Sequence, residues 1–511
     1  NTSTVLYNGT MAQCVKGITY GNLSFSNGGA AAKTLVSSGT VNGDILVNSG
    51  ATLHSGGFTI TLLGNWTNSG TFTASTGTIV FNGAAKTITG NTTFNRITVN
   101  GSYTVANNDI VYNGLINVTT TGSYVSGGGI ATLNGDLTNS GSLTSTGTTT
   151  FTGTSVQTLR LLNALNSTST GIVNFNGNVT PVMNSTSSPN FATLNINNTA
   201  GVNPSVTWNI FIAMNVNSGA TFNGGVSTHN IYGNFTNAGT TTSTGTLNYI
   251  PSTAKTINFG GSGFSSTGTI NFGGSGQITM AGTAGTLNNV AIVNTNVSGV
   301  TPSSGWDMTG KFSISSNSIF NASSYSYTVG TDIESDGTLN GGSSTFTMNS
   351  TDGTLTGSPV TFFNHFSIGT AALVTANSDF SVAGNYTNNG TYDGTIGNLT
   401  MTGSAAATIG GTPVSNALSQ LIIAKTGGAT VTMAVGLIDV FTLYIQSGTL
   451  FTSTYGITQD VTGGFLIIDD GATLRLGGTN SLPAFSGYGL DANSNVDYAG
   501  STQSVANAAV Y

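Results

Sequence analysis

The chain has 511 residues, of which only 16 are acidic and 9 are basic, so its formal net charge is −7. The scattered basic residues exclude a basic stripe for nucleic acid, and no window approaches the roughly 18 apolar residues of a membrane span. A single cysteine excludes an intramolecular disulfide framework, and the low charge with abundant Gly, Thr and Asn predicts an extracellular or cell-surface location.

Short runs rich in Val, Ile, Phe, Tyr and Thr occur along the whole chain and are closed by Gly, Asn or Ser. Apolar and polar residues alternate within these runs, as in Thr78-Ile79-Val80-Phe81, which predicts strands with one buried face. The sequence therefore predicts an ordered all-β protein.

One phrase recurs along the chain. It reads GNWTNSGTFTASTGTIVFNG from Gly64, and related phrases begin at Gly135, Gly233 and Gly384. They share the frame G-[ND]-aromatic or Leu-T-N-x-G. A Thr followed by Ile or Leu comes about 23 residues after the first Gly of each phrase, at Thr87, Thr158, Thr256 and Thr408.

Segments this short cannot bury their apolar faces alone, so they must stack on one another. We predict an elongated parallel β-helix (β-solenoid) of roughly 23 short, irregular coils, in which each phrase encodes one coil. Gly and Asn would form the corners, and Asn and Thr at equivalent positions would form hydrogen-bonded ladders. The alternative is a series of tandem antiparallel β-sandwich domains, because turn signals such as Asn82-Gly83 also occur.

The phrase from Gly64, with the KTITGNTTFNRITVNG that follows it, resembles repeats in large secreted surface proteins of bacteria and archaea, of the filamentous-haemagglutinin and autotransporter-passenger type. The resemblance covers most of the chain and rests on composition. It implies a β-helix, a surface location and an adhesive or structural role, and it supplies no catalytic residue.

One acidic group is a weak candidate for a metal or catalytic site: Asp332, Glu334 and Asp336. On a strand these carboxylates would share one face at a separation of about 6.8 Å, which suits Ca²⁺ or inverting glycoside hydrolysis. The alternative is a solvent-facing strand, because no basic or aromatic residue lies nearby in the sequence. We therefore predict no catalytic residue, no cofactor and no enzyme activity.

Other polar residues give weaker signals. The histidines are far apart in the sequence and have no ligand partners at metal-binding spacing, so they are expected at ordinary surface or core positions: His54, His229 and His365. Cys14 is expected to be a small buried residue. The number of N-x-[ST] sequons is what chance gives in this composition, but N-glycosylation is possible at repeat corners, and the candidates include Asn8, Asn65, Asn91, Asn117, Asn234 and Asn385.

The composition changes toward the C-terminal end. Residues 1–410 are uniformly rich in Gly, Ser, Thr and Asn, whereas 411–511 are more apolar, which predicts a uniform solenoid followed by a more apolar continuation. The run Phe465-Leu466-Ile467-Ile468 predicts a strand that is buried on both faces.

The two ends of the sequence match each other. The first stretch, VLYNGTMAQCVKGITY, aligns with the last, VDYAGSTQSVANAAVY, when one gap is allowed. No capping element is recognisable at either end, and an open solenoid end is an unpaired strand edge. We therefore expect the solenoid either to belong to a longer one or to stack head to tail on copies of itself, through Val5, Tyr7, Gln13, Tyr20, Val496, Tyr498, Gln503 and Tyr511.

These observations predict a structural subunit or segment of an extracellular filament, sheath or surface fibre, with copies of itself as partner. An alternative is a cell-surface adhesin that binds glycans or other surfaces through exposed aromatic residues, the tryptophans Trp66, Trp208 and Trp306 among them. A remote alternative is a polysaccharide-cleaving β-helix enzyme that would use the acidic group at 332–336.

Overall fold

The computed structural model describes residues 3–27, 31–358, 361–436 and 438–505. Within these residues the chain forms short β-strands that pair in parallel, and it forms no helix. The successive coils stack on one another and make about 23 turns. The predicted β-solenoid is confirmed, and the parallel pairing excludes the antiparallel sandwich alternative.

Over most of the described residues the repeating element is a coil of three strands, so most strands pair with the strands three places before and after them. Strand β12 (Thr78–Phe81) thus lies between β9 (Thr59–Leu62) and β15 (Arg96–Val99). The register aligns three buried residues in one core column, Ile60, Ile79 and Ile97. Alternation along each strand therefore becomes stacking of like residues between coils.

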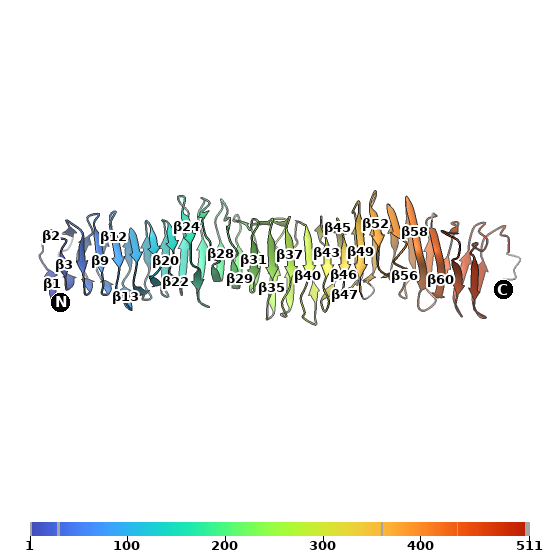
Figure 1. Ribbon diagram of the computed structural model, residues 1–511, viewed down its shortest axis with the longest axis horizontal. Helices are drawn as coiled ribbons and strands as arrows, with labels where there is room; N and C mark the ends of the chain where they lie inside the picture. The colour runs from blue at the N-terminus through green and yellow to red at the C-terminus, as the bar shows by residue number, and fades with distance from the viewer. Residues whose placement is uncertain (1–2, 28–30, 359–360, 437, 506–511) are drawn as a thin grey trace. The chain divides into compact units, whose positions relative to one another are not determined.

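The chain divides into two compact units, residues 1–248 and 249–511. In unit 1 the coils follow one another in chain order, from the blue end to the green part of the ribbon (Figure 1). One side of unit 1 is a nine-stranded sheet, made of β3 (Thr19–Tyr20), β6 (Gly39–Val41), β9, β12, β15, β18 (Ile116–Val118), β21 (Leu137–Asn139), β24 (Thr158–Leu161) and β27 (Val182–Met183).

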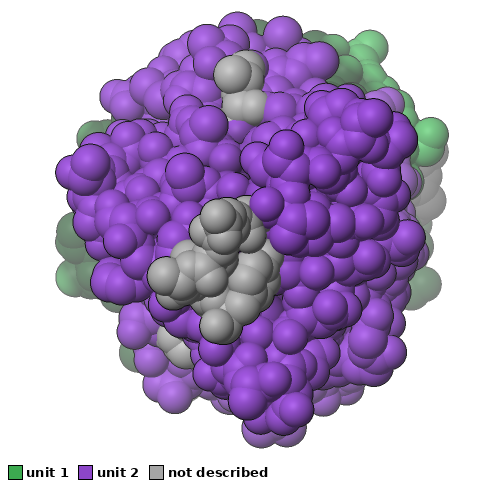
Figure 2. All heavy atoms as spheres, turned by 90° about the vertical axis from the view of Figure 1, so that its right-hand side faces the viewer, with its two compact units in different colours: residues 1–248 green, residues 249–511 purple. Residues whose placement is uncertain are grey.

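Unit 2 is built in the same way, and Figure 2 shows it end-on from the side of its last described coils. One of its sides is an eleven-stranded parallel sheet, made of β39 (Thr286–Leu287), β42 (Asp307–Met308), β45 (Ser326–Val329), β48 (Thr345–Met348), β51 (His365–Ile368), β54 (Tyr386–Asn388), β57 (Ala407–Gly411), β59 (Thr430–Met433), β61 (Thr449–Phe451), β64 (Thr473–Leu476) and β66 (Asn495–Tyr498). The compositional change near residue 411 lies inside this unit.

Glycine is required where one coil turns closely over another. Gly90 has a φ of +88°, and an added Cβ would lie 1.8 Å from the carbonyl oxygen of Asn68 in the coil before. No other residue type fits this combination of left-handed backbone and close contact. The high glycine content is in part a consequence of such corners.

The recurring phrase encodes about one coil, as predicted, because each copy holds three successive strands, at 66–68, 71–73 and 78–81 in the first copy. Its first copy places β10 (Trp66–Asn68) beside β7 (Ile45–Val47) and β13 (Lys86–Thr89). Its second copy places β21 in the nine-stranded sheet, on another side of unit 1. Each copy therefore supplies the strands of one coil, and different copies begin on different sides of the coil.

The apolar run near the C-terminal end is not buried on both faces, so that prediction was wrong. In β63 (Phe465–Ile468), Leu466 and Ile468 are buried, whereas Phe465 is 49% exposed and Ile467 is partly exposed. A solenoid strand has only one face toward the core, and apolar residues on its outer face remain at the surface.

Candidate functional site

The fifth residue of each phrase is an asparagine that the fold buries: Asn68, Asn139, Asn237 and Asn388. The Nδ2 group of Asn139 donates hydrogen bonds to the carbonyl oxygens of Asn163 and Ala164, both at 3.0 Å, and its Oδ1 accepts the N–H of Gly141. This side chain satisfies buried backbone groups of its own corner and of the next coil.

The second residue of each phrase lies toward solvent and bonds to the next coil. The Oδ1 atom of Asp136 accepts the backbone N–H of Thr158 at 2.7 Å, and Asn385 accepts that of Thr408 at 3.0 Å. These threonines are the ones that recur about 23 residues after each phrase begins. The recurring spacing of about 23 residues in the sequence therefore reflects a hydrogen bond between neighbouring coils.

Asparagine ladders run from coil to coil in unit 1, as predicted. In each ladder the Nδ2 group of one asparagine donates to the Oδ1 atom of the asparagine one coil earlier. One ladder has bond lengths of 2.7 to 3.0 Å and joins Asn166, Asn190, Asn209, Asn230 and Asn248. Two shorter ladders join Asn174, Asn195 and Asn215, and Asn176, Asn197 and Asn217. Each ladder ties successive coils along the outside of the sheet.

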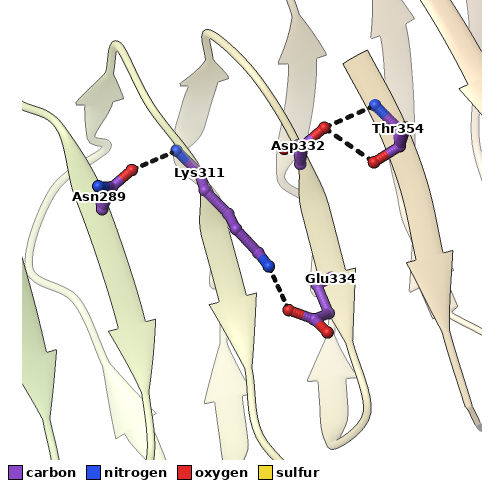
Figure 3. Close-up of polar contacts among 5 residues, drawn as sticks. All are labelled: Asn289, Lys311, Asp332, Glu334 and Thr354. Carbon is purple, nitrogen blue, oxygen red and sulfur yellow. Dashed lines mark hydrogen bonds and ion pairs between the residues drawn. The ribbon is translucent and has the colours of Figure 1, made fainter.

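The acidic candidates at 332–336 lie on and beside β46 (Ile333–Ser335), and each has different surroundings. Figure 3 shows those of Asp332 and Glu334. Asp332 accepts hydrogen bonds from the N–H and the hydroxyl of Thr354, at 2.9 and 2.8 Å. Glu334 forms an ion pair with Lys311 of the coil before, which the local sequence did not reveal. Asp336 is exposed.

Among the described residues, no group of three His, Cys, Asp or Glu side chains could hold a metal ion, and this includes the acidic trio. Asp332 and Glu334 each have a partner in a neighbouring coil. The metal and catalytic roles gain no geometric support at these positions.

The tryptophans proposed for glycan contact lie in the core, so that prediction was wrong. Trp66 is fully buried, and its Nε1–H donates to the hydroxyl of Thr92 at 3.2 Å. Trp208 and Trp306 are 3% exposed. Large rings gain most by filling the interior, where they also find aromatic neighbours.

An aromatic pair that does reach the surface was not anticipated. Phe211 is 48% exposed and stacks on Tyr232 of the next coil, with ring centroids 5.0 Å apart and planes at 5°. The two rings face each other and therefore present mainly their edges to solvent.

His229 is buried and has two backbone partners. Its Nδ1 accepts the N–H of Trp208 at 3.2 Å, and its Nε2 lies 2.9 Å from the carbonyl oxygen of Gly224 and donates to it in the neutral ring. Burial lowers the pKa of His229, and the bond to Gly224 opposes this effect. The ring is a structural member of the corner.

The other sequence candidates lie at ordinary positions. His54 is partly exposed, and the Nδ1 atom of His365 accepts the N–H of Asn385 at 2.8 Å. Cys14 is exposed, which corrects the expectation of burial. It alternates with the buried Val15 on the same short strand and therefore faces outward.

The predicted assembly residues lie in the first and last described coils. Strand β1 (Thr4–Tyr7) pairs with β4 (Asn22–Phe25), its one partner among the described strands. Val5 lies over the buried Leu23 yet is 39% exposed, because no described strand covers its other side. The Tyr7 hydroxyl lies 3.1 Å from that of the buried Tyr20.

At the other end β66 pairs with β64, which places Val496 over Leu474 and Tyr498 over Leu476. Tyr511 lies outside the described residues. All six sequon asparagines named above are partly or fully exposed: Asn8, Asn65, Asn91, Asn117, Asn234 and Asn385.

A partly open hollow with a volume of about 350 Å³ lies beside the loop 477–486. Asn480 lines this hollow, and its Nδ2 group donates to the carbonyl oxygen of Tyr455 at 2.8 Å and to the hydroxyl of Thr452 at 3.1 Å. The described residues that line it carry hydroxyl, amide and apolar groups, and none is Asp, Glu, His, Lys or Arg.

Comparison of the chain with family models, with curated proteins and with solved structures finds no match in any of the three. In the part of the chain that the structure describes, no helix is long and apolar enough to cross a membrane. The arguments below therefore rest on the chain's own residues.

Proposed function

We propose that this chain is a structural segment of an extracellular filament, sheath or surface fibre in which solenoid coils continue from one copy to the next. The observation that carries the proposal is the use of the polar side chains. Repeated asparagines bridge neighbouring coils, both in the buried corners, as Asn139 does, and in the ladder that begins at Asn166. Such a bonding pattern stabilises stacking along one direction.

The energetic logic supports the same role. Backbone pairing, apolar columns and amide ladders depend little on charge, whereas only two ion pairs, Lys311–Glu334 and Arg475–Asp497, occur among the described residues. Exposed ion pairs weaken with salt, but stacked backbone and amide bonds do not. A fibre of this kind would tolerate the changing ionic conditions outside a cell.

Electron microscopy of the source cells and of the purified full chain tests the proposal. We expect antibody label on surface fibres, and filaments that lengthen with protein concentration and persist in high salt. Label confined to the cell interior, together with only single particles at high concentration, would overturn it.

The adhesin and enzyme alternatives stay predictions. Burial of Trp66, Trp208 and Trp306 removes the aromatic platform on which the adhesin alternative relied. The partners of Asp332 and Glu334 give these carboxylates roles in joining coils. The fibre proposal uses observations that run along both units, so we prefer it.

A further inference from the structure

A recurring polar bridge closes one corner of the coil. After β23 (Thr148–Phe151), the Oε1 atom of Gln157 accepts the N–H of Gly153 at 2.8 Å, and its Nε2 group donates to the carbonyl oxygens of Leu133 and Gly135, at 2.8 and 2.9 Å. Leu133 is the residue paired with Phe151 one coil earlier. The glutamine thus joins its own corner to the preceding coil.

Gln503 makes the same bridge after β66. Its Oε1 accepts the N–H of Gly500 at 2.6 Å, and its Nε2 donates to the carbonyl oxygens of Leu476 and Asn480, at 3.1 and 2.8 Å. Leu476 is paired with Tyr498 one coil earlier, as Leu133 is with Phe151.

A tyrosine replaces the glutamine at a third corner, after β12. The hydroxyl of Tyr103 accepts the N–H of Gly83 at 3.1 Å, and it lies 2.9 Å from the carbonyl oxygen of Leu62 and 3.0 Å from that of Gly64. Leu62 is the residue paired with Phe81 in the preceding coil. At these three corners the bridge therefore has one shared target, the carbonyl opposite the last residue of the strand.

Gln13 makes half of this bridge. Its Oε1 accepts the N–H of Gly9 at 3.1 Å, after β1 ends at Tyr7. Its Nε2 group has no acceptor among the described residues, because the described stack holds no coil before β1. By the pattern of these three corners, the missing acceptor is the carbonyl of a residue opposite Tyr7.

We propose that β1 receives β66 of a second copy, in parallel and in the register Val496–Val5 and Tyr498–Tyr7. In this register the Nε2 group of Gln13 donates to the carbonyl oxygen of Tyr498 of the other copy. The proposal rests on the fibre function above and specifies its junction.

The choice of occupant rests on the matching strands. Val5 and Tyr7 belong to the core columns of unit 1, since they lie over Leu23 and Phe25, yet both remain partly exposed. Val496 and Tyr498 continue columns of the same spacing in unit 2 and are also partly exposed. Stacking the two strands would bury both pairs of side chains, as each described coil does for the one before it.

Disulfide trapping tests the register. The outward residues Leu6 and Asp497 would lie opposite each other, at the strand spacing of about 4.8 Å, which permits a disulfide. In a Cys14→Ser background, a chain with Leu6→Cys mixed with a chain with Asp497→Cys should give a covalent dimer on oxidation. Ser24→Cys in place of Leu6→Cys lies one coil further away, at about 10 Å, and should give none.

A matched pair of substitutions tests the bridge. Gln13→Glu keeps the acceptor for Gly9 but replaces the donor with a carboxylate oxygen, so end-to-end association should weaken about tenfold or more while the thermal unfolding midpoint stays unchanged. Gln157→Glu makes the same change inside the stack and should lower that midpoint. Sedimentation measures the association, and circular dichroism measures the folding.

The outcomes separate this inference from the fibre proposal. Fibres that form without the covalent dimer of the Leu6→Cys and Asp497→Cys chains, or that are insensitive to Gln13→Glu, would overturn the junction and leave the fibre. A trapped dimer from a protein that makes no surface fibre would support the junction and overturn the fibre function. Absence of both association and dimer would overturn the junction.

Discussion

The side-chain oxygen of Asn65 lies 3.0 Å from the backbone nitrogen of Thr87, one coil further along the stack. Asn65 in turn donates its own backbone N–H to Asp44, and Asp44 donates its N–H to Asn22. A chain of such bonds runs along the outside of unit 1. In each of these bonds, a side-chain oxygen accepts a backbone N–H of the next coil. The stability that one such exposed bond provides can therefore be compared with that of the buried asparagine in the same phrase.

The buried and the exposed bridge of one phrase should differ in their contribution to stability. Asn139→Ala leaves two carbonyl oxygens and the Gly141 N–H unpaired in the interior, so it should lower the free energy of unfolding by about 2 to 3 kcal/mol. Asp136→Ala exposes the Thr158 N–H to water and should lower it by about 0.5 to 1 kcal/mol. Denaturant unfolding, with hydrogen exchange at Gly141 and Thr158, measures both. Equal losses would contradict the assignment.

The ion pair between Lys311 and Glu334 should contribute little. Both side chains are about 40% exposed, so Lys311→Ala and Glu334→Gln should each cost less than about 1 kcal/mol, and the cost should vanish in 1 M salt. Asp332→Ala is the comparison, because its bonds to Thr354 are not an ion pair and its cost should persist in salt. Denaturant titrations at low and high salt give these values. A Lys311→Ala loss that is unaffected by salt would be inconsistent with this explanation.

Acid should loosen the corner around His229. Burial holds the pKa of this histidine below its unfolded value of about 6.5, so the stability it provides is complete above that pH and is lost as the pH falls through the lower folded value. Protonation of Nδ1 would break the bond from the Trp208 N–H. The protection factor of the Trp208 N–H, its intrinsic exchange rate divided by the observed rate at the same pH, should therefore fall below pH 6.5. In His229→Gln, which retains an acceptor and a donor, the protection factor at Trp208 should not respond to pH in this range.

Alkali should unfold the chain only above the ordinary tyrosine range. Burial raises the pKa of Tyr103 to about 12 and raises that of Tyr112 and Tyr386 well above 10. Their contribution is complete below the unfolded pKa of about 10 and is lost as the pH rises toward the folded values. Tyrosinate absorbance should show these residues ionising together with the loss of circular dichroism. Complete ionisation near pH 10 with the fold intact would contradict their burial.

The sequence predicts the fold well because period-two alternation has a simple physical meaning. Thr78 to Phe81 alternates between faces, and the structure buries Ile79 and Phe81 as expected. The same rule could have located the buried asparagines, since Asn68 lies two residues after Trp66 and so shares its face. Polarity suggested a corner for the asparagine and aromatic character suggested the surface for the tryptophan. Whether a side chain is buried depends more on its position along the strand than on its polarity or aromatic character.

Contacts between coils were harder to predict than the coils. Lys311 and Glu334 lie 23 residues apart, and their pairing depends on the register of β43 (Phe312–Ile314) with β46. Coil lengths vary, so the local sequence cannot place the two charges side by side. The recurring threonines did carry this information, because Thr87 and Thr158 keep the spacing of their acceptors. A repeated spacing is a better guide than a single residue.

Most side-chain bridges in this fold reach only one coil away, as the span of 21 residues from Asp44 to Asn65 and of 22 from Asn65 to Thr87 shows. Recombination between two similar phrases in the gene would therefore remove or duplicate the coils between them. The coils joined at the new junction could still form their side-chain bridges, because these need only the neighbouring coil. Because the copies that begin at Gly64 and at Gly135 start on different sides of the coil, a crossover between them would not add or remove a whole number of coils. Lineages carrying such a gene would be expected to diverge in the number of coils sooner than in the residues that bridge them.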